Sequence, residues 1–137
     1  MELTVYTDGA SRGNPGLASY GFVVKDDKGK ILFEEGKTLG VATNNFAEYS
    51  AILASLEYVK LIFKNSEQVS INFLMDSKLA VEQLSGRFKV KNPAIKGFCT
   101  KITGISSIFK KVSYTHIPRH LNYEADRLAN IALDSLI

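Results

Sequence analysis

The sequence predicts an α/β fold in which a mixed sheet carries helices on its faces. Three short β-rich runs near the start are separated by tight-turn residues, which predicts strands joined by short connections. Helical spacing follows, and strand-length and helical patterns then alternate to the end. The order of three strands, helix, strand, two helices, strand and helix is typical of a mixed sheet flanked by helices.

The first three strands are expected to form an antiparallel meander. Their cores are Leu3–Thr7, Tyr20–Val24 and Ile31–Phe33. Asp8-Gly9 follows the first run, and the stretches at 12–16 (RGNPG) and 26–29 (DDKG) precede the next two. Because Gly, Pro, Asn and Asp favour tight turns, we expect the first strand to end at Thr7.

A long amphipathic helix is expected from Asn45 onward, because the apolar residues change there to helical spacing. Its apolar face is Ile52, Leu53, Leu56, Val59 and Phe63. The next apolar run, Val69–Met75, has the length of a strand. A strand that feeds a helix is half of a crossover unit, and a brief helix is expected here up to Gly86.

The last third of the chain is expected to hold a helix, a strand and a final helix. Pro93 can open a helix that runs through Ile105, and Lys111–Ile117 alternates as a strand. Asn122 is a plausible cap for the last helix. The apolar stripe of that helix is Ala125, Leu128, Ala129, Ala132, Leu133 and Leu136.

Length and composition favour one compact unit. A chain of 137 residues with 45% hydrophobic content can bury one sizeable core, so we expect residues 1–137 to form a single domain. The N-terminal residues resemble neither a secretion signal nor a membrane anchor, so we expect a soluble, cytoplasmic protein without membrane contact. No separate apolar face is evident, which favours a monomer. The one cysteine, Cys99, is expected to be a small buried hydrophobe.

The net charge of +3 is unevenly distributed. Residues 1–76 hold seven Lys/Arg and ten Asp/Glu, a balance of −3, whereas residues 77–137 hold ten and four, a balance of +6. A basic half suits a polyanion such as nucleic acid, although an excess of this size is also common in proteins that bind none.

Four acidic residues stand where a functional site can form, and each also has an ordinary structural explanation. Asp8 can make an Asx-turn into Gly9. Glu48 lies three residues after Asn45, so the two can form a capping box. Asp76 can cap the helix that follows it, and Asp126 can interact favourably with the dipole of the last helix.

The four acids share a placement that favours a metal site. Asp8, Glu48, Asp76 and Asp126 all fall at the expected end of a strand or start of a helix, and such positions converge at one rim of a mixed sheet. Carboxylates brought that close repel one another unless cations neutralise them. Ligand sets made only of oxygen select Mg²⁺ or Mn²⁺ rather than zinc.

Four segments in order resemble the signatures of type 1 ribonuclease H. They are Thr7–Gly16 (TDGASRGNPG), Thr43–Glu48 (TNNFAE), Met75–Ser77 (MDS) and Asn122–Ala129 (NYEADRLA). The resemblance implies a ribonuclease H-like fold, a five-stranded mixed sheet whose first three strands are antiparallel, flanked by helices. It also implies an endonuclease that hydrolyses the RNA strand of RNA/DNA hybrids and leaves 5′-phosphomonoesters.

The same resemblance implies roles for the acids. Asp8, Glu48, Asp76 and Asp126 correspond to the metal-binding carboxylates of a site for two Mg²⁺ ions, with Mn²⁺ as a substitute. Two ions about 3.5–4 Å apart can activate a water and stabilise the departing oxygen. Asp8 would bridge the ions, Glu48 and Asp76 would hold the water-side ion, and Asp126 the other. Glu48 can also reach a 2′-hydroxyl, the group that distinguishes RNA from DNA.

Substrate contacts implied by the resemblance fall in two regions. They are Gly9, Ser11, Asn14, Asn44, Asn45 and Lys78 for the hybrid, and the loop residues Arg87, Phe88, Lys89 and Lys91 for the DNA strand. Turn and cap chemistry explains the asparagines equally well. A solvated charge run is the commoner meaning of a basic loop such as this one.

Three departures from the family pattern bear on mechanism. There is no room between Gly86 and Pro93 for the basic protrusion of many relatives, so hybrid affinity is expected to rest on the loop cations and Lys96. Lys78 stands where many relatives have a polar amide. Arg119, in an Ile-Pro-Arg context, is expected to assist catalysis rather than His116, because His116 falls within an expected strand.

Two other functions stay open on the sequence alone. One is a module that binds hybrids or duplex RNA without cutting, which the presence of all four acids disfavours. The other is a strand-transfer or junction nuclease on the same scaffold, because fold does not determine function. Double-stranded RNA also stays open as a side substrate.

Overall fold

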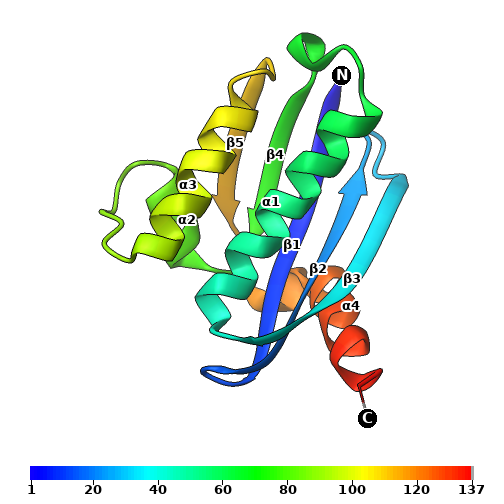
Figure 1. Cartoon of the computed structure of the whole chain (residues 1–137). Coiled ribbons are helices and arrows are strands. Elements are labelled where there is room, and N and C mark those ends of the chain that lie inside the picture. The colour runs from blue at the N-terminus through cyan, green and yellow to red at the C-terminus, as the bar shows by residue number, and fades with distance from the viewer. Residues whose placement is uncertain (137) are drawn as a thin grey trace.

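The computed structural model describes residues 1–136 and places five strands in one mixed sheet (Figure 1). The strands are β1 (Glu2–Gly13), β2 (Gly16–Lys25), β3 (Ile31–Ala42), β4 (Ser70–Met75) and β5 (Lys111–His116). Their order across the sheet is β3-β2-β1-β4-β5. The first three pair antiparallel, and β1, β4 and β5 run parallel. The expected five-stranded mixed sheet with an antiparallel start is therefore confirmed.

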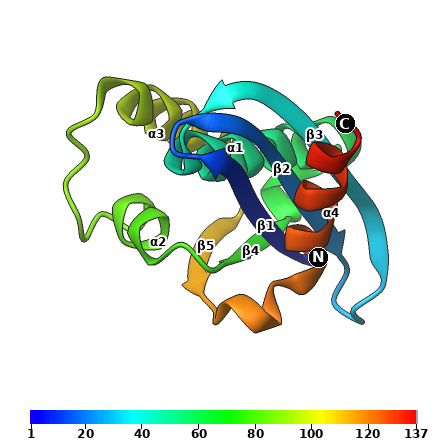
Figure 2. The ribbon, with the colours of Figure 1, turned by 90° about the horizontal axis from the view of Figure 1, so that it is seen from below.

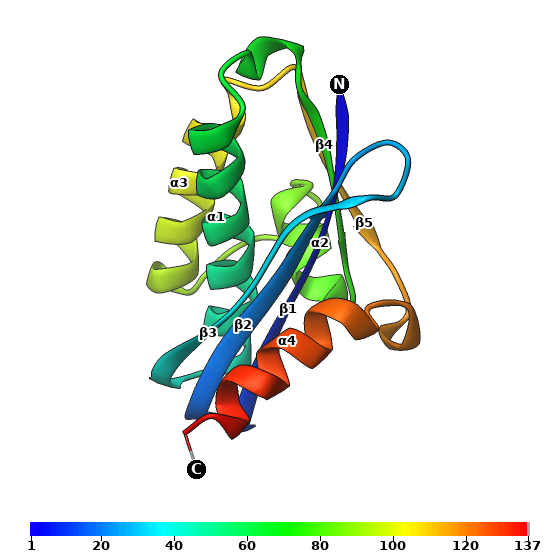
Figure 3. The same cartoon turned by 90° about the vertical axis from the view of Figure 1, so that its right-hand side faces the viewer.

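Helices cover both faces of this sheet. They are α1 (Asn44–Ile62), α2 (Lys78–Leu84), α3 (Pro93–Ser106) and α4 (Tyr123–Asp134), with short 3₁₀ turns at Ser66–Gln68 and Arg119–Leu121. In Figure 3, α1 and α3 lie together on one face and α4 lies on the other. Figure 2 shows α2 and the loop after it on the side of the molecule away from α4.

Two strands are longer than the turn signals suggested. The expectation that the first strand ends at Thr7 is wrong, because β1 continues to Gly13 and stays paired with β2, with Asp8 opposite Gly21. Similarly, β3 continues far beyond Phe33, to Ala42. Antiparallel pairing along β2 satisfies the main-chain hydrogen bonds of both neighbours, and this outweighs local turn propensity.

The apolar face of α1 packs where the helical spacing placed it. Ile52, Leu56 and Val59 are fully buried against the sheet. Burying such a side chain contributes about 1.5–3 kcal/mol, so this helix is anchored mainly by its contacts with the sheet. Cys99 departs from expectation, because α3 lies at the outer side of α1 and leaves this thiol partly exposed.

Glycines allow main chains to touch on both faces of the sheet. A Cβ on Gly9 would lie 2.4 Å from the Glu48 nitrogen of α1. On the opposite face, a Cβ on Gly21 would lie 2.3 Å from the Ala125 oxygen of α4. Ser19 also holds α4 there, through a buried hydrogen bond from its hydroxyl to the Ala129 oxygen at 2.6 Å. Close main-chain approach therefore sets the distance from β1 to α1 and the distance from β2 to α4.

Among residues 1–136, no helix combines the length and the apolar character needed to cross a lipid bilayer.

Candidate active site

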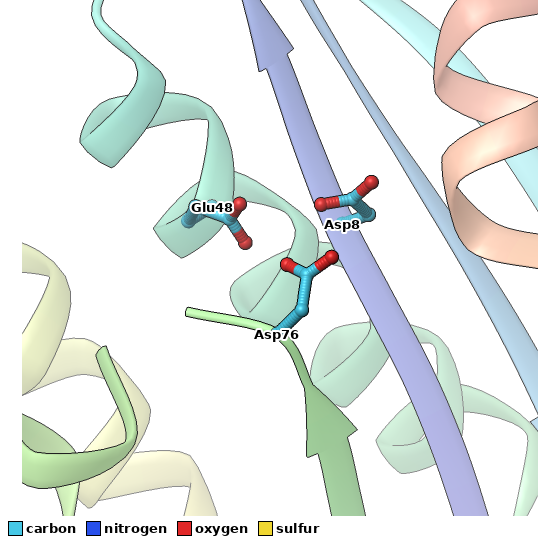
Figure 4. Close-up of side chains that lie close together, drawn as sticks. All are labelled: Asp8, Glu48 and Asp76. Carbon is cyan, nitrogen blue, oxygen red and sulfur yellow. The ribbon is translucent and has the colours of Figure 1, made fainter. Parts of the chain in front are cut away.

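Three carboxylates from separate parts of the chain meet at one edge of the sheet. Asp8 comes from β1, Glu48 from α1 and Asp76 from the residue directly after β4, and Figure 4 shows their side chains pointing toward one another. One oxygen of each lies within 4.8 Å of the others. The expected convergence of these acids at one rim is what the fold produces.

Strand lengths explain how Asp8 and Asp76 come together. The last parallel pair between β1 and β4 is Thr7 with Met75, so the next residues along the chain are Asp8, still on β1, and Asp76, directly after β4. Asp76 does not cap α2, because Ser77 does so by accepting a hydrogen bond from the Ala80 amide at 3.1 Å. The Asp76 carboxylate is therefore free to face the pocket.

Glu48 does not make the capping box considered from the sequence. The cap of α1 is Thr43, whose hydroxyl accepts from the Phe46 amide at 3.1 Å. The cap thus lies two residues before Asn45, which places Glu48 in the second turn of the helix and beyond reach of the cap. Its Oε2 atom is buried and has no hydrogen-bond partner within residues 1–136. A buried carboxylate oxygen without a donor is costly unless a cation or water meets it.

Asp126 enters the same pocket from α4. It lies in the first turn of the helix and lines the pocket with the three clustered acids. Its Oδ1 lies 3.2 Å from Asn130 Nδ2 and 3.9 Å from Arg119 Nη2. Asn122 occupies the expected cap position of α4, but its Oδ1 accepts no cap hydrogen bond, and its Nδ2 donates to the Thr7 oxygen.

Burial and mutual repulsion raise the pKa values of the clustered acids. Burial, then the charges of Glu48 and Asp76, raise the pKa of Asp8 to about 10. The pKa of Glu48 rises to about 8, first through burial and then through Asp76. Burial raises the pKa of Asp76 as well, opposed by Arg119 and Asn122. Strongly raised carboxyl pKa values in a cleft are typical of a functional site.

The donor set fits divalent cations. All converging ligand atoms are carboxylate oxygens, the hard ligands that Mg²⁺ and Mn²⁺ take. Positive charge would ionise Asp8 and Glu48 and give the unpartnered Oε2 of Glu48 a partner. Such a site can promote attack of water on a phosphodiester.

The pocket around the carboxylates is polar and has a volume of about 620 Å³. Most of the residues that the sequence singled out for the site line it: Asp8, Gly9, Ser11, Asn14, Asn44, Asn45, Glu48, Asp76, Arg119 and Asp126. Asn14 Oδ1 accepts a hydrogen bond from the Asn44 amide at 3.1 Å, which joins the β1–β2 turn to the start of α1. One side of the rim is thus built from main-chain groups and short amides.

The remaining expected contacts do not line this pocket, although Lys78 stands between Ser77 and Leu79, which do. Lys78, Arg87, Phe88, Lys89 and Lys91 are exposed and do not line it. The loop residues lie between α2 and α3, far from α4 in Figure 2. Arg87 is paired within the chain, with its Nη2 3.2 Å from Glu82 Oε1.

Some pocket residues were not singled out from the sequence as site residues. They are Ala10, Arg12, Ser77, Leu79, Asn130 and Leu133. Asn130 could have been predicted from the sequence, because it lies four residues after Asp126 and therefore on the same face of the helix. Arg12 forms an ion pair with Asp134 at the end of α4, which no local pattern indicates.

Comparisons with known proteins agree with this geometry. The family model described as reverse transcriptase-like matches residues 6–132. The structure of ribonuclease H1 from the archaeon Halobacterium salinarum is 39% identical, with a TM-score of 0.91, over 98% of this chain and 99% of that one. The chain belongs to the type 1 ribonuclease H family. A second family member, LC11-RNase H1 in complex with an RNA/DNA hybrid, is 38% identical, with a TM-score of 0.93, over 98% of both chains.

Some ribonuclease H relatives are longer than this chain. The bifunctional protein Rv2228c of Mycobacterium tuberculosis is 44% identical over 98% of the chain, which spans only 36% of that relative. Ribonuclease HI of Halobacterium salinarum is 41% identical over 94% of the chain, which spans 63% of it.

Proposed function

We propose that residues 1–137 act as a single, monomeric ribonuclease H domain that cuts the RNA strand of RNA/DNA hybrids with the help of two divalent cations, Mg²⁺ or Mn²⁺. The observation that carries the proposal is the group formed by Asp8, Glu48 and Asp76, whose oxygens lie within 4.8 Å of one another. The unpartnered, buried Oε2 of Glu48 supports it further.

Each acid has a role that follows from its position. Asp8 is almost fully buried, and Glu48, Asp76 and Asp126 all raise its pKa, which suits a ligand shared by both ions. Glu48 and Asp76 suit the ion on the water side, and Asp126 the other. Bound ions supply a water of lowered pKa and positive charge at the departing oxygen. Arg119 is 82% exposed on its turn and can reach a phosphate at the pocket mouth.

Substrate class is supported by the rim of the pocket and by a relative. Asn14, Asn44 and Asn45 present short amides beside the acids, and groups of this kind suit the wide, shallow minor groove of an A-like duplex. The 38%-identical LC11-RNase H1 has been seen in complex with an RNA/DNA hybrid. A contact from Glu48 to a 2′-hydroxyl would restrict cleavage to RNA.

The basic loop between α2 and α3 supplies a second contact with the hybrid, at a distance from the carboxylates that cut the RNA strand. Lys89, Lys91 and the exposed Phe88 lie between α2 and α3, away from the carboxylates. Lysines there can neutralise phosphates of the DNA strand, and an exposed aromatic ring can pack on its sugars. We expect Lys89→Glu and Lys91→Glu to weaken hybrid binding and to reduce its salt dependence, with little change in kcat.

The deciding experiment is a cleavage assay on an RNA/DNA hybrid, double-stranded RNA and branched DNA, with Mg²⁺, with Mn²⁺ and with EDTA. We expect RNA-strand cleavage of the hybrid that needs metal and leaves 5′-phosphates. Asp8→Asn is the matched control, because it keeps the size of the side chain and removes the shared ligand. Hybrid binding without cleavage at any metal concentration, or preferred cleavage of branched DNA, would overturn the proposal.

A further inference from the structure

Asn130 lies one helical turn after Asp126, on the face of α4 that meets the pocket. Its Nδ2 donates to the Asp126 main-chain oxygen at 2.9 Å and lies 3.2 Å from Asp126 Oδ1. Asn130 is half-buried and lines the same pocket as the acids. One side-chain amide thus contacts both the backbone and the carboxylate of a single acid.

Helix stability alone does not explain an asparagine here. Asn is a poorer helix former than Ala, because its side chain competes for backbone hydrogen bonds. The faces of α4 that pack on the sheet are already filled by Ala125, Ala129 and Leu133, which are fully or almost fully buried. The main-chain oxygen that Asn130 contacts belongs to the regular helix. The contact with the Asp126 carboxylate is therefore the distinctive one.

Asp126 comes from α4, on the face of the sheet opposite to α1 (Figure 3). Asp8, Glu48 and Asp76 form the tight group, and the Asp126 side chain interacts with that of Asp8. The other donor near its Oδ1 is Arg119, which is 3.9 Å away and 82% exposed. A side chain that free in solvent restrains a neighbour weakly. Asn130, which is half-buried within the helix, is the ordered donor.

We propose that Asn130 is a positioning residue that holds Oδ1 of Asp126 and so leaves Oδ2 available to a divalent cation. The inference rests on the proposed function. A neutral amide suits this task, because it orients the carboxylate without cancelling the charge that the cation needs, whereas a Lys or Arg at this position would compete with the ion. Partners of metal ligands typically change metal affinity by about 10–100-fold when they are removed.

The test compares three substitutions of Asn130 with a control next to it. Asn130→Leu keeps the approximate size and removes the donor, Asn130→Ala removes the whole amide, and Asn130→Gln restores an amide that can reach residue 126. Ile131→Ala is the control, because Ile131 is 50% exposed and lies outside the pocket. Mg²⁺ binding to the substrate-free protein is measured by calorimetry, and hybrid cleavage is measured across Mg²⁺ concentrations.

We expect Asn130→Leu and Asn130→Ala to weaken one Mg²⁺ binding event by about tenfold. The Mg²⁺ concentration for half-maximal cleavage should rise by a similar factor, while kcat at saturating Mg²⁺ stays within about threefold of wild type. Asn130→Gln should recover most of the affinity. The metal-free Tm of Asn130→Ala should not fall, because Ala is the better helix former.

Two results would overturn the inference and leave the proposed function intact. One is an unchanged Mg²⁺ affinity in Asn130→Leu. The other is a loss of Mg²⁺ affinity that also occurs in Ile131→Ala and parallels a fall in Tm. Failure of the proposed function looks different, because wild type itself would then neither bind Mg²⁺ nor cut the hybrid, and the role of Asn130 would fall with it.

Discussion

Asn122 donates a hydrogen bond from Nδ2 to the main-chain oxygen of Thr7, at 2.8 Å and in the fully buried interior. The bond joins the start of α4 to β1 at the residue before Asp8, although the two residues are 115 positions apart. It therefore links the strand that carries Asp8 to the helix that carries Asp126.

We expect Asn122→Ala to lower the free energy of unfolding by about 1–3 kcal/mol, because it leaves the buried Thr7 oxygen without this donor. Urea denaturation measures the change. Asn65→Ala is a suitable control, since Asn65 is exposed and makes no cap hydrogen bond. Equal stability of the two variants would show that the bond contributes nothing.

Asp76→Asn should abolish hybrid cleavage and leave folding intact. The substitution keeps the size of the side chain and removes one of the three clustered carboxylates. We expect at least about a 10³-fold loss of kcat at saturating metal, because a full ligand charge is lost. Circular dichroism and thermal melting check that the fold is retained. Wild-type rates in this variant would remove Asp76 from the site.

The metal-free protein should lose stability as pH rises. The pKa of Asp8 is 3.8 in the unfolded chain and about 10 in the folded protein, so the folded state binds the proton more tightly. The resulting stabilisation is fully present below pH 3.8 and is lost as the pH rises toward 10. The raised pKa of Glu48 also lowers the stability as the pH rises, between pH 4.5 and about pH 8. In EDTA at pH 8, Asp8→Asn should therefore be more stable than wild type, by on the order of 1–3 kcal/mol.

Denaturation of both proteins from pH 4 to pH 9 tests this linkage. The stability difference should be small at pH 4 and grow with pH, and Mg²⁺ should raise the Tm of wild type more than that of Asp8→Asn. A difference that does not vary with pH would mean that burial of Asp8 does not control the stability of the metal-free fold.

Arg119→Ala should slow cleavage more than it weakens hybrid binding. Arg119 lines the pocket and lies 3.9 Å from Asp126, whereas His116 is exposed at the end of β5 and lies outside the pocket. We expect about a 10–100-fold fall in kcat for Arg119→Ala and less than about a threefold change for His116→Ala. Single-turnover kinetics separate the chemical step from product release. The reverse ranking would assign the assisting role to His116.

Gly21→Ala should be among the most destabilising single-methyl changes in the chain. The new Cβ would lie 2.3 Å from the Ala125 oxygen, and neither main chain can move aside cheaply. We expect a loss of about 3 kcal/mol or more, or failure to fold. Gly97→Ala in α3 is the matched control, because no atom lies within 4 Å of its added Cβ. This second variant should gain about 0.5–1 kcal/mol in free energy of unfolding.

Periodicity and turn chemistry predicted most of the elements, because they depend on residues near one another in the chain. The apolar face of α1 and the strand before Asp76 are examples. The predicted end of β1 was wrong because β1 continues to pair with β2 beyond Asp8. Local signals cannot report a hydrogen bond to a strand whose register is set elsewhere.

In the candidate site, too, local sequence predicted some features, whereas others depend on contacts between distant residues. Spacing alone left Glu48 as a cap, since local rules cannot tell whether a helix starts at Asn44 or Asn45. Once Thr43 caps α1, Glu48 is freed for the pocket. Convergence of the acids was expected from their shared placement at one rim. The contact from Asn130 to Asp126 depends on side-chain rotamers and so required the structure.

The contact between Gly9 and α1 makes the spacing of the acidic side chains independent of the side chains proposed to contact the substrate. Because main-chain atoms of β1 and α1 approach closely there, the spacing of Asp8 and Glu48 is set next to the two acids by the backbone. We therefore expect substitutions at Asn44 or Lys78, two of the proposed substrate contacts, to leave the spacing of β1 and α1 at Gly9 unchanged. If the proposed function holds, substrate preference can be altered at these positions without moving Asp8 relative to Glu48.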